Sequence, residues 1–473
     1  MKDRSRLTHL PRPGAVVAVL AFAGMGASFM QTILVPIQSE LPKLLGAARE
    51  DTAWVITVTL LVSAIFTPIS GKLGDMYGKR RIAIILLALL IAGSVICALS
   101  STVIPMIVGR ALQGTGMGVI PLGISILRDT LHPDRLGSSI ALVSATLGVG
   151  GALGLPISAF VTENFDWHAL FFVAAAIGAI SLVLFIFVIP PSTLRTPGRF
   201  DLLGAIGLAI GLTGIMLTIS KGNEWGWLTF PTLISGGIGI VALLIWGAYQ
   251  WRHVDPLVDL RVSVRGPVLM TNLASIAMGF ALFSSSIVFP QLLELPRDAG
   301  GLGMPLLTAS FALMPSGLAM LAMSPIAGRL IDRIGPKSLL IVGAVVIAVT
   351  YAFAVFLPAT VWSVAISNTF IGVGIGLGYA AMPTLIMRAV PSTETGAANG
   401  LNTLMRSLGT SIAAAAVAAV LAQSAGATGF PTPQGFQLAL VYGLVAAVVC
   451  AVLASLIPRS REGVEAHPSL PGE

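Results

Sequence analysis

The chain has 473 residues, of which 55% are hydrophobic and only 10% are charged, with a formal net charge of +7. A soluble domain carries roughly 25% charged residues because its surface must be hydrated, so this composition excludes an array of soluble domains. The basic residues lie in short segments between apolar runs, which argues against nucleic-acid binding. The two cysteines, Cys97 and Cys450, stand alone in apolar runs and indicate neither a disulfide framework nor a metal site.

Apolar runs long enough to cross a bilayer recur along the whole chain. A transmembrane helix needs about 20 mostly apolar residues. We expect fourteen spans, near residues 14–38, 52–71, 81–100, 103–127, 137–161, 168–190, 202–220, 230–250, 267–290, 303–327, 338–358, 361–386, 397–422 and 436–457. The first apolar run is too long for a signal-peptide core, so we expect this span to be retained.

The basic residues indicate the orientation of the spans. If the N-terminus is cytoplasmic, 21 of the 27 Lys and Arg residues fall in cytoplasmic segments and four in external loops. Cytoplasmic loops carry the excess of Lys and Arg in membrane proteins, and a missed span would invert the alternation downstream of the error. We therefore expect both termini in the cytoplasm. The two remaining cations, Arg110 and Arg406, lie within spans.

Two loops repeat one pattern. Residues 71–81, between spans two and three, and residues 328–337, between spans ten and eleven, both read G-[KR]-L-x-D-x-x-G-x-[KR], at an offset of 257 residues. Duplicated halves around a central site are a recurring transporter architecture. We expect a six-helix half at 1–192, an inserted helix pair with flanking loops at 193–265, a second six-helix half at 266–458 and a short tail at 459–473.

The repeated loop suggests a conformational role for its charges. An Asp among several cations can bridge to them and to a helix N-terminus, and so form a latch that closes in only one conformation. The alternative is a tight basic turn that only fixes topology. The residues predicted to act in this way are Gly71, Asp75, Gly78, Arg81 and, in the second copy, Asp332.

The first loop resembles the signature loop of the major facilitator superfamily. In span four, Arg110-Ala-Leu-Gln113-Gly114-Thr-Gly116 resembles the R-x-x-Q-G-x-G motif of this family. In span five, residues 150–156, with Gly150, Gly154 and Pro156, resemble its antiporter motif. The residues around the inserted pair, at 201–204, 224–227 and 256–260, are similar to those of the fourteen-span drug:proton antiporters.

This resemblance implies an all-α major facilitator fold in a bacterial-type plasma membrane. It implies a secondary transporter, not an enzyme, that exports amphipathic small molecules such as drugs or toxic metabolites in exchange for protons. We expect no cofactor, no metal and a monomer. The alternatives are a lipid or metabolite facilitator without tight proton coupling and a transporter-like receptor or scaffold.

Two departures from the family pattern leave the proton-coupling residue open. Leu155 separates the motif glycine from Pro156, and Met30-Gln31 stand before Thr32 where many members carry an Asp. In this chain all 20 Asp and Glu residues fall in loops or at span ends. The acidic candidates for coupling are therefore Asp51, Glu294 and Glu40, near the external ends of their spans, and the alternative is that each is a solvated loop charge.

Ionisable groups inside a span are costly and are functional candidates by default. Arg110 is predicted to relay or respond to protonation, and the alternative is a snorkelling or structurally paired arginine. Arg406 is predicted to act in the same way or to join the two halves at the cytoplasmic side. Polar side chains within spans either line a cavity or hydrogen-bond between helices. The residues predicted to line a substrate cavity are Met30, Gln31, Thr32, Gln113, Asn272, Ser285, Asn368 and Asn402.

Overall fold

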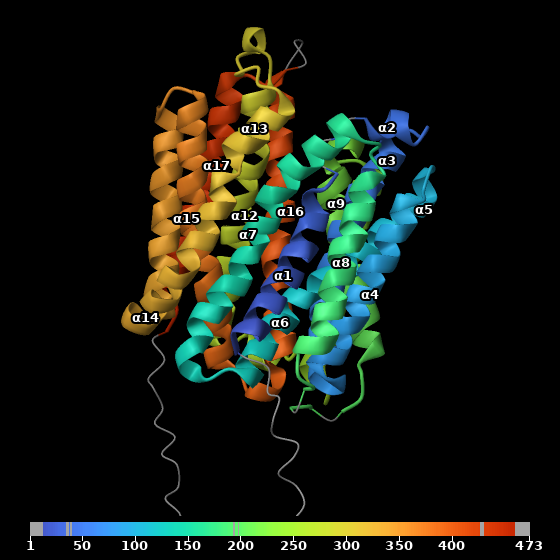
Figure 1. The fold of residues 1–473 in the computed structure, drawn as a ribbon, viewed down its shortest axis with the longest axis vertical. Coiled ribbons are helices and arrows are strands. Elements are labelled where there is room, and N and C mark those ends of the chain that lie inside the picture. The colour runs from blue at the N-terminus through green and yellow to red at the C-terminus, as the bar shows by residue number, and fades with distance from the viewer. Residues whose placement is uncertain are drawn as a thin grey trace, which may run out of the picture.

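The computed structural model describes residues 13–34, 37, 40–192, 194–196, 198–425 and 430–458. Within these ranges every regular element is a helix, and the long helices run side by side as one bundle (Figure 1). Helix α1 begins and α17 ends at the same end of the bundle (Figure 1). We call this end the termini side.

The first half of the bundle is built from six spans. They are α1 Pro13–Thr32, α3 Arg49–Tyr77, α4 Lys79–Ala98, α5 Val103–Thr115 continued by η2 Gly116–Gly118 and α6 Val119–Thr130, α7 Pro133–Asn164, and α8 Ala169–Val188. The short α2, Leu41–Leu44, lies at the end opposite the termini side (Figure 1). The apolar core of this half surrounds Phe171 and Phe185.

The second half has a core of its own around Phe289 and Tyr351. Its helices are α12 Gly266–Glu294, α13 Leu306–Leu313, α14 Pro315–Phe356, α15 Val361–Ala389, α16 Thr395–Ala425 and α17 Pro433–Ser455. Short helical turns connect some of them: α11 Leu260–Ser263, η3 Arg297–Ala299 and η4 Ser392–Glu394. Most of each core belongs to one half, although Ala141 and Ala145 of α7 pack in the second core and a third cluster joins α3, α9 and α16.

Thirteen stretches of the described chain are long and apolar enough to cross a membrane. One of them, Leu306–Phe356, has 51 residues. At 1.5 Å per residue a straight helix of that length would reach about 77 Å, more than twice the hydrocarbon thickness. The helix breaks at Gly335, whose φ of 80° suits glycine. This stretch therefore supplies two spans, and the described chain has the fourteen expected from the sequence.

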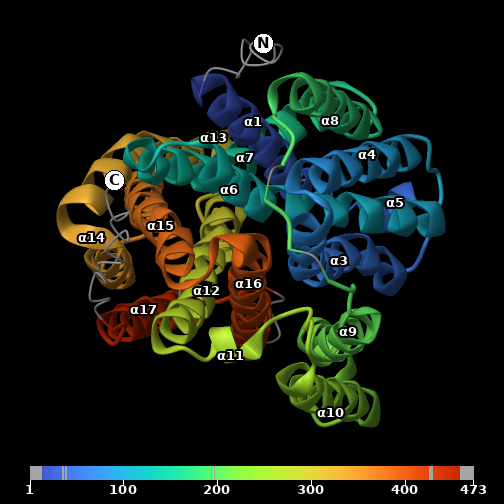
Figure 2. The ribbon, with the colours of Figure 1, turned by 90° about the horizontal axis from the view of Figure 1, so that it is seen from below.

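The inserted pair consists of α9 Leu202–Trp225 and α10 Phe230–Arg252. Figure 2 shows both at the flank of the bundle, with α9 against α3 and α16 and with α10 outermost. Leu244 and Ile245 of α10 are about two-thirds exposed, at 69% and 65%. Exposed apolar side chains on a spanning helix indicate a lipid-facing surface.

Asp201 fixes this pair at the termini side. Its buried carboxylate caps α9 by accepting the Gly204 N–H at 2.7 Å. It also accepts the Tyr249 hydroxyl at 3.0 Å, the Gln250 side-chain amide at 2.7 Å and the Leu257 N–H at 3.3 Å. One carboxylate thus joins the start of α9, the end of α10 and the following loop.

Candidate functional site

The Asp75 carboxylate, in the last turn of α3, contacts the other half of the protein. It is buried and accepts the backbone N–H of Gly396 at 3.1 Å and of Ala397 at 2.9 Å, both in the first turn of α16. The first N–H groups of a helix have no partner within it and carry the positive end of its dipole, so a carboxylate is stabilised there. Asp75 therefore joins the two halves at the termini side.

Lys79, in the first turn of α4, extends this contact. Its ammonium lies 3.8 Å from the Asp75 carboxylate, 2.7 Å from the Asp129 carboxylate and 3.1 Å from the Thr395 hydroxyl. All four side chains are buried or nearly so, and a buried charge is tolerated only when it is paired and hydrogen-bonded. We call Asp75, Lys79, Asp129, Thr395 and the two N–H groups of Gly396 and Ala397 the latch network.

Two glycines allow the helices to come this close. A Cβ atom added to Gly396 would lie 2.6 Å from the Gly71 carbonyl oxygen, and one added to Gly71 would overlap the Gly396 carbonyl.

The segment that leads into α9 contacts both halves beside the latch network. Thr196 donates its N–H to the Asp75 carbonyl and its hydroxyl to the Thr393 carbonyl, both at 2.8 Å. A segment of the inserted region therefore packs directly against the latch network.

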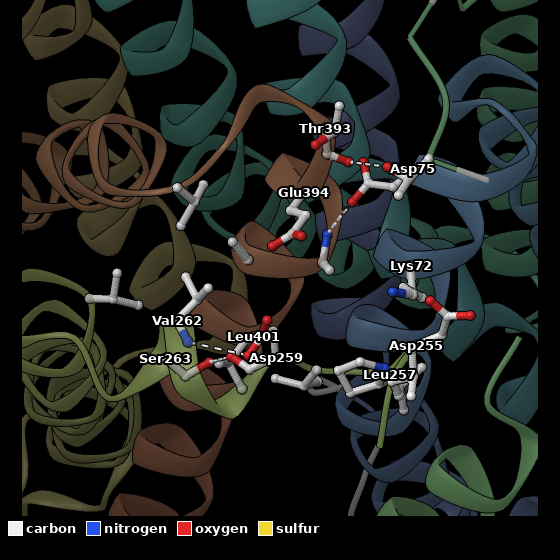
Figure 3. Close-up of a pocket in the computed structure, with 18 residues that line it drawn as sticks. Lys72, Asp75, Asp255, Leu257, Asp259, Val262, Ser263, Thr393, Glu394 and Leu401 are labelled. Carbon is white, nitrogen blue, oxygen red and sulfur yellow. Dashed lines mark hydrogen bonds between the residues drawn. The ribbon is translucent and has the colours of Figure 1, made fainter. Parts of the chain in front are cut away.

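A small pocket opens beside the latch network. Its volume is about 120 Å³, and it lies between the ends of α3 and α10 and the start of α16. Figure 3 shows Lys72, Asp75 and Glu394 around it, with Asp255 and Asp259 from the loop after α10. The loop of the inserted pair therefore borders the contact between the halves.

The second copy of the repeat keeps the backbone geometry but not the buried charge. Gly328 packs closely on α7, since an added Cβ would lie 2.5 Å from the Ser138 Cα. Gly78 and Gly335, at equivalent positions of the two loops, both have positive φ, at 103° and 80°. In contrast, Asp332 is exposed where Asp75 is buried, and Arg81 is also exposed. The Asp332 carboxylate lies beside the first turns of α7, where a Cβ on Gly137 would be 3.8 Å from its Oδ1 atom, but among the described residues only Asp75 of these two acids accepts backbone N–H groups at a helix start.

Arg110 is fully buried in the first half. Its guanidinium donates to the carbonyls of Val55 at 3.2 Å and Met30 at 2.8 Å, and to the Gln113 side chain at 2.7 Å. Gln113 in turn donates to the Ser94 hydroxyl at 2.8 Å. Among the described residues no carboxylate pairs with Arg110, so its charge is solvated by dipoles alone.

Arg406, on α16, is buried in the second half. Its guanidinium carbon lies 4.4 Å from the centre of the Tyr379 ring on α15, a cation–π distance. One terminal nitrogen, Nη2, donates to the Thr403 hydroxyl at 3.2 Å. The other, Nη1, is buried without a hydrogen-bond partner among the described residues.

The predicted cavity residues do not gather in one place. Met30 and Gln113 belong to the Arg110 cluster, whereas Asn272 and Asn402 bond to each other at 3.0 Å near Arg406. The others donate to backbone carbonyls of the same or a neighbouring helix, or are half-buried: Thr32, Ser285, Asn368 and Gln31. Their role as a cavity lining remains a prediction.

The antiporter-motif residues lie on α7 against α1. A Cβ on Gly150 would lie 2.5 Å from the Met25 carbonyl oxygen, and one on Gly154 would overlap Thr32. Pro156 is inside the helix and buried. The glycines serve close helix packing in this structure, and a further role as a hinge or seal stays a prediction.

Two of the acidic candidates for proton coupling lie at the end opposite the termini side. Asp51 is in the first turn of α3 and Glu294 is the last residue of α12, and both are exposed. Within the described chain no group of three or more His, Cys, Asp or Glu is placed to hold a metal ion.

Four side chains of these networks were not predicted from the sequence. Asp129 follows Arg128 at the end of α6 and has the sequence context of an ordinary loop acid. Lys79 was counted only among the basic residues of its loop, Thr395 stands at the start of a helix, and Tyr379 stands in a glycine-rich run. The repeat pattern gave no signal for Lys79, because the second copy has Pro336 at that position.

Fourteen spans in two halves, joined at one end by buried charges, define a multi-pass membrane transporter. The family model of the Major Facilitator Superfamily matches residues 20–414 and, in a second match, residues 271–472. The chain therefore belongs to the major facilitator superfamily, whose members are transporters and not enzymes.

Several curated relatives resemble the chain at low identity. The lincomycin resistance protein LmrB of Listeria monocytogenes is 26% identical, over 95% of this chain and 97% of that protein. The probable multidrug resistance protein EmrY of Escherichia coli is 25% identical, over 86% and 81%. The uncharacterized MFS-type transporter YhcA of Bacillus subtilis is 27% identical, over 72% of this chain and only 63% of that protein.

A solved structure shares the fold. The human organic anion transporter MFSD10 superposes with a TM-score of 0.67 at 12% sequence identity, over 95% of this chain and 100% of that one. At this identity the likeness shows the fold alone.

Proposed function

We propose that this protein exports amphipathic small molecules across a bacterial-type plasma membrane in exchange for protons. Relatives that carry the names of lincomycin and multidrug resistance proteins support a drug-like substrate. The excess of Lys and Arg in the segments at the termini side supports a cytoplasmic position for that side. The partners are then the bilayer, a lipophilic solute and protons.

The observation that carries the proposal is the contact of Asp75 with the start of α16. Transporters of this architecture work by rocking one half against the other around a fixed site. Most of the apolar core of each half, at 1–192 and 266–458, lies within that half, and a charge-dependent contact joins the two at the termini side. Such a contact opens when a proton or a substrate changes the local charge balance, which is what alternating access requires.

Coupling to protons rests on Arg110 and on the exposed acids. Arg110 has only dipoles around it among the described residues, so a nearby change in charge alters its free energy strongly. Asp51 and Glu294 face the external solution in the proposed orientation and can exchange protons with it. A facilitator without proton coupling is the second candidate, because the described spans hold no acid near their middle.

Transport by the purified protein tests both candidates. The full chain is reconstituted in liposomes with an imposed pH gradient, and the movement of a lipophilic cation, a neutral drug and a carboxylated amphipath is followed. Exchange for protons predicts accumulation of at least one solute against its gradient, abolished by a protonophore. Equilibration without accumulation would show a facilitator, and no movement of any solute would refute the proposal.

A further inference from the structure

A polar stripe follows one face of α16 from the latch network into the bundle. Thr395, Asn399, Asn402 and Arg406 recur at helical spacing and are all buried. Arg406 is the twelfth residue of this helix, so it lies about 16 Å along the axis from its first residue, near the middle of a bilayer about 30 Å thick. The stripe therefore reaches the depth at which transporters hold their substrates.

Arg406 retains an unused donor at that depth. Its Nη1 is buried without a hydrogen-bond partner among the described residues, and its side chain is 5% exposed. A buried donor without an acceptor is unfavourable, and more so when it is charged. Near the start of the stripe, the Asn399 side-chain oxygen is also buried without a described partner. The stripe thus holds polar atoms that the described protein groups do not satisfy.

No carboxylate compensates the charge of Arg406. The ion pairs of the described chain involve Lys79, Lys221 and His168, and neither Arg406 nor Arg110 joins one. The acids of the described spans lie within a few residues of a helix end or, for Asp332, beside the break at Gly335. The middle of the described spans therefore carries the two cations Arg110 and Arg406 and no acid, which disfavours a cationic solute there and favours an anionic one.

The neighbours of Arg406 hold its guanidinium in one orientation. The Tyr379 ring supports one face of the guanidinium and helps to fix its orientation. Asn402 lies one turn away and is held by Asn272 and by the Ser275 hydroxyl, at 3.0 and 2.8 Å. A guanidinium held in this way offers its terminal N–H groups to a carboxylate or sulfonate in fixed geometry.

Arg110 does not compete for this role. Its Nε and Nη1 atoms already donate to two backbone carbonyls and to Gln113. Arg406 has only the Thr403 hydroxyl and the ring of Tyr379. Among the described residues, Arg406 thus donates one hydrogen bond where Arg110 donates three.

We propose that Arg406, supported by Tyr379 and Asn402, is the subsite that binds the anionic group of an amphipathic substrate. This inference rests on the proposed export function and names its substrate class as organic anions rather than lipophilic cations. The α16 helix also contacts α3 of the other half, where a Cβ on Gly400 would lie 2.8 Å from the Thr67 carbonyl oxygen. Separation of the halves moves this contact and gives solute access to the stripe.

A matched pair of probes tests the subsite by binding, independently of transport. The probes are 1-naphthylacetate and its neutral isostere 1-naphthylacetamide, titrated onto the purified full chain with tryptophan fluorescence as the readout. A charge-assisted hydrogen bond predicts that the wild type prefers the anion by at least about tenfold. Arg406→Gln should reduce this ratio to near one while neutral-probe affinity stays within about twofold. Arg406→Lys, which keeps the charge, should retain part of the preference.

Controls separate the subsite from folding and from transport. Arg388→Gln removes an exposed cation at the end of α15 and should leave the ratio unchanged. An unchanged anion preference in Arg406→Gln, or a wild type that binds tetraphenylphosphonium more tightly than 1-naphthylacetate, would overturn the subsite. Transport of cations but not of anions into liposomes would contradict the anion subsite and still support the proposed export function. Anion-selective binding without transport of any solute would support the anion subsite and contradict the proposed export function.

Anionic lipid is a second source of the same chemistry. Binding of 1-naphthylacetate is therefore compared in liposomes of phosphatidylcholine alone and of phosphatidylcholine with phosphatidylglycerol. Competition by phosphatidylglycerol that is lost in Arg406→Gln would show a lipid headgroup at the subsite. Binding that is insensitive to the lipid would show that the subsite takes the free amphipath.

Discussion

Asp75 and Gly396 are 321 residues apart in the chain, yet the Asp75 carboxylate accepts the Gly396 N–H at 3.1 Å. This bond connects the last turn of α3 to the first turn of α16 and so connects one half of the transporter to the other. It is buried and lies at the positive end of a helix dipole, and both its charge assistance and its stabilisation by the dipole depend on the ionised carboxylate. A contact with this dependence suits a gate between two states.

Replacing Asp75 tests the gate directly. Asp75→Asn keeps the shape but removes the charge, and loss of a charge-assisted hydrogen bond costs about 1.5–3 kcal/mol, or roughly tenfold or more in the closed population. We expect at least a tenfold loss of transport at unchanged expression. Asp332→Asn, in the exposed second copy, should transport normally. Full transport by a well-expressed Asp75→Asn protein would show that the loop serves only to fix the topology of the chain.

Crowding the contact should have the same effect without changing any charge. In Gly71→Ala the new methyl group would overlap the Gly396 carbonyl, so the halves could not close fully at the termini side. We expect transport to fall at least about tenfold. The control is Gly237→Ala on α10, where an added Cβ meets nothing within 4 Å. Equal rates for the two variants would show that the closed contact is not needed for turnover.

Arg110 is expected to be essential for active transport. Arg110→Ala removes the buried charge and the donor shared by the Met30 carbonyl and the Gln113 side chain, and Arg110→Lys keeps the charge but loses the planar donor arrangement. We expect no proton-driven uptake into inverted vesicles for the first variant and partial uptake for the second. The exposed Arg199→Ala serves as the control at matched protein level. If Arg110→Ala transported at the wild-type rate, Arg110 would not be needed for proton coupling, and Asp51 and Glu294 would be the remaining candidates.

Asp201 should matter for stability rather than for turnover. Asp201→Ala leaves buried donors of Tyr249, Gln250 and Leu257 without their acceptor, at a cost of about 1–3 kcal/mol. We expect a lower midpoint of thermal unfolding in detergent and faster proteolysis in the loop after α10. Asp255→Asn, at the half-buried pocket rim, is the comparison. Unchanged thermal stability would mean that the inserted pair does not depend on this carboxylate.

Reporter fusions test the orientation of the chain in the membrane. Fourteen spans with a cytoplasmic N-terminus predict that reporters fused at Gly198 and Gly266 are cytoplasmic and that one at Asn223 is external. Gly198 lies before α9, Asn223 in the last turn of α9 and Gly266 at the start of α12, so the three reporters test the orientation of the inserted pair. An external reporter at Gly266 would contradict the proposed orientation of the second half.

The spans were predictable because hydrocarbon demands about 20 apolar residues whatever the tertiary contacts are. Thus α15, Val361–Ala389, falls close to the predicted 361–386. The break at Gly335 was also foreseeable, since glycine and proline stand together in a basic loop. In contrast, the partner of Asp75 lies on a helix 321 residues away, and no local pattern encodes that pairing. The stacking of Arg406 on Tyr379 was equally hidden, because an aromatic residue in an apolar run does not reveal which cation it faces.

The distance between the halves at the termini side tests the central claim most directly. Spin labels are attached at Tyr77→Cys, near the end of α3, and Ser392→Cys, before α16, both exposed, after the buried Cys97 and Cys450 are replaced by Ser. Electron–electron double resonance then gives the distance distribution in lipid for the otherwise native chain and for Asp75→Asn. The account predicts a mainly short distance in the first and a large second population at longer distance in the second. Identical distributions for the two proteins would contradict it.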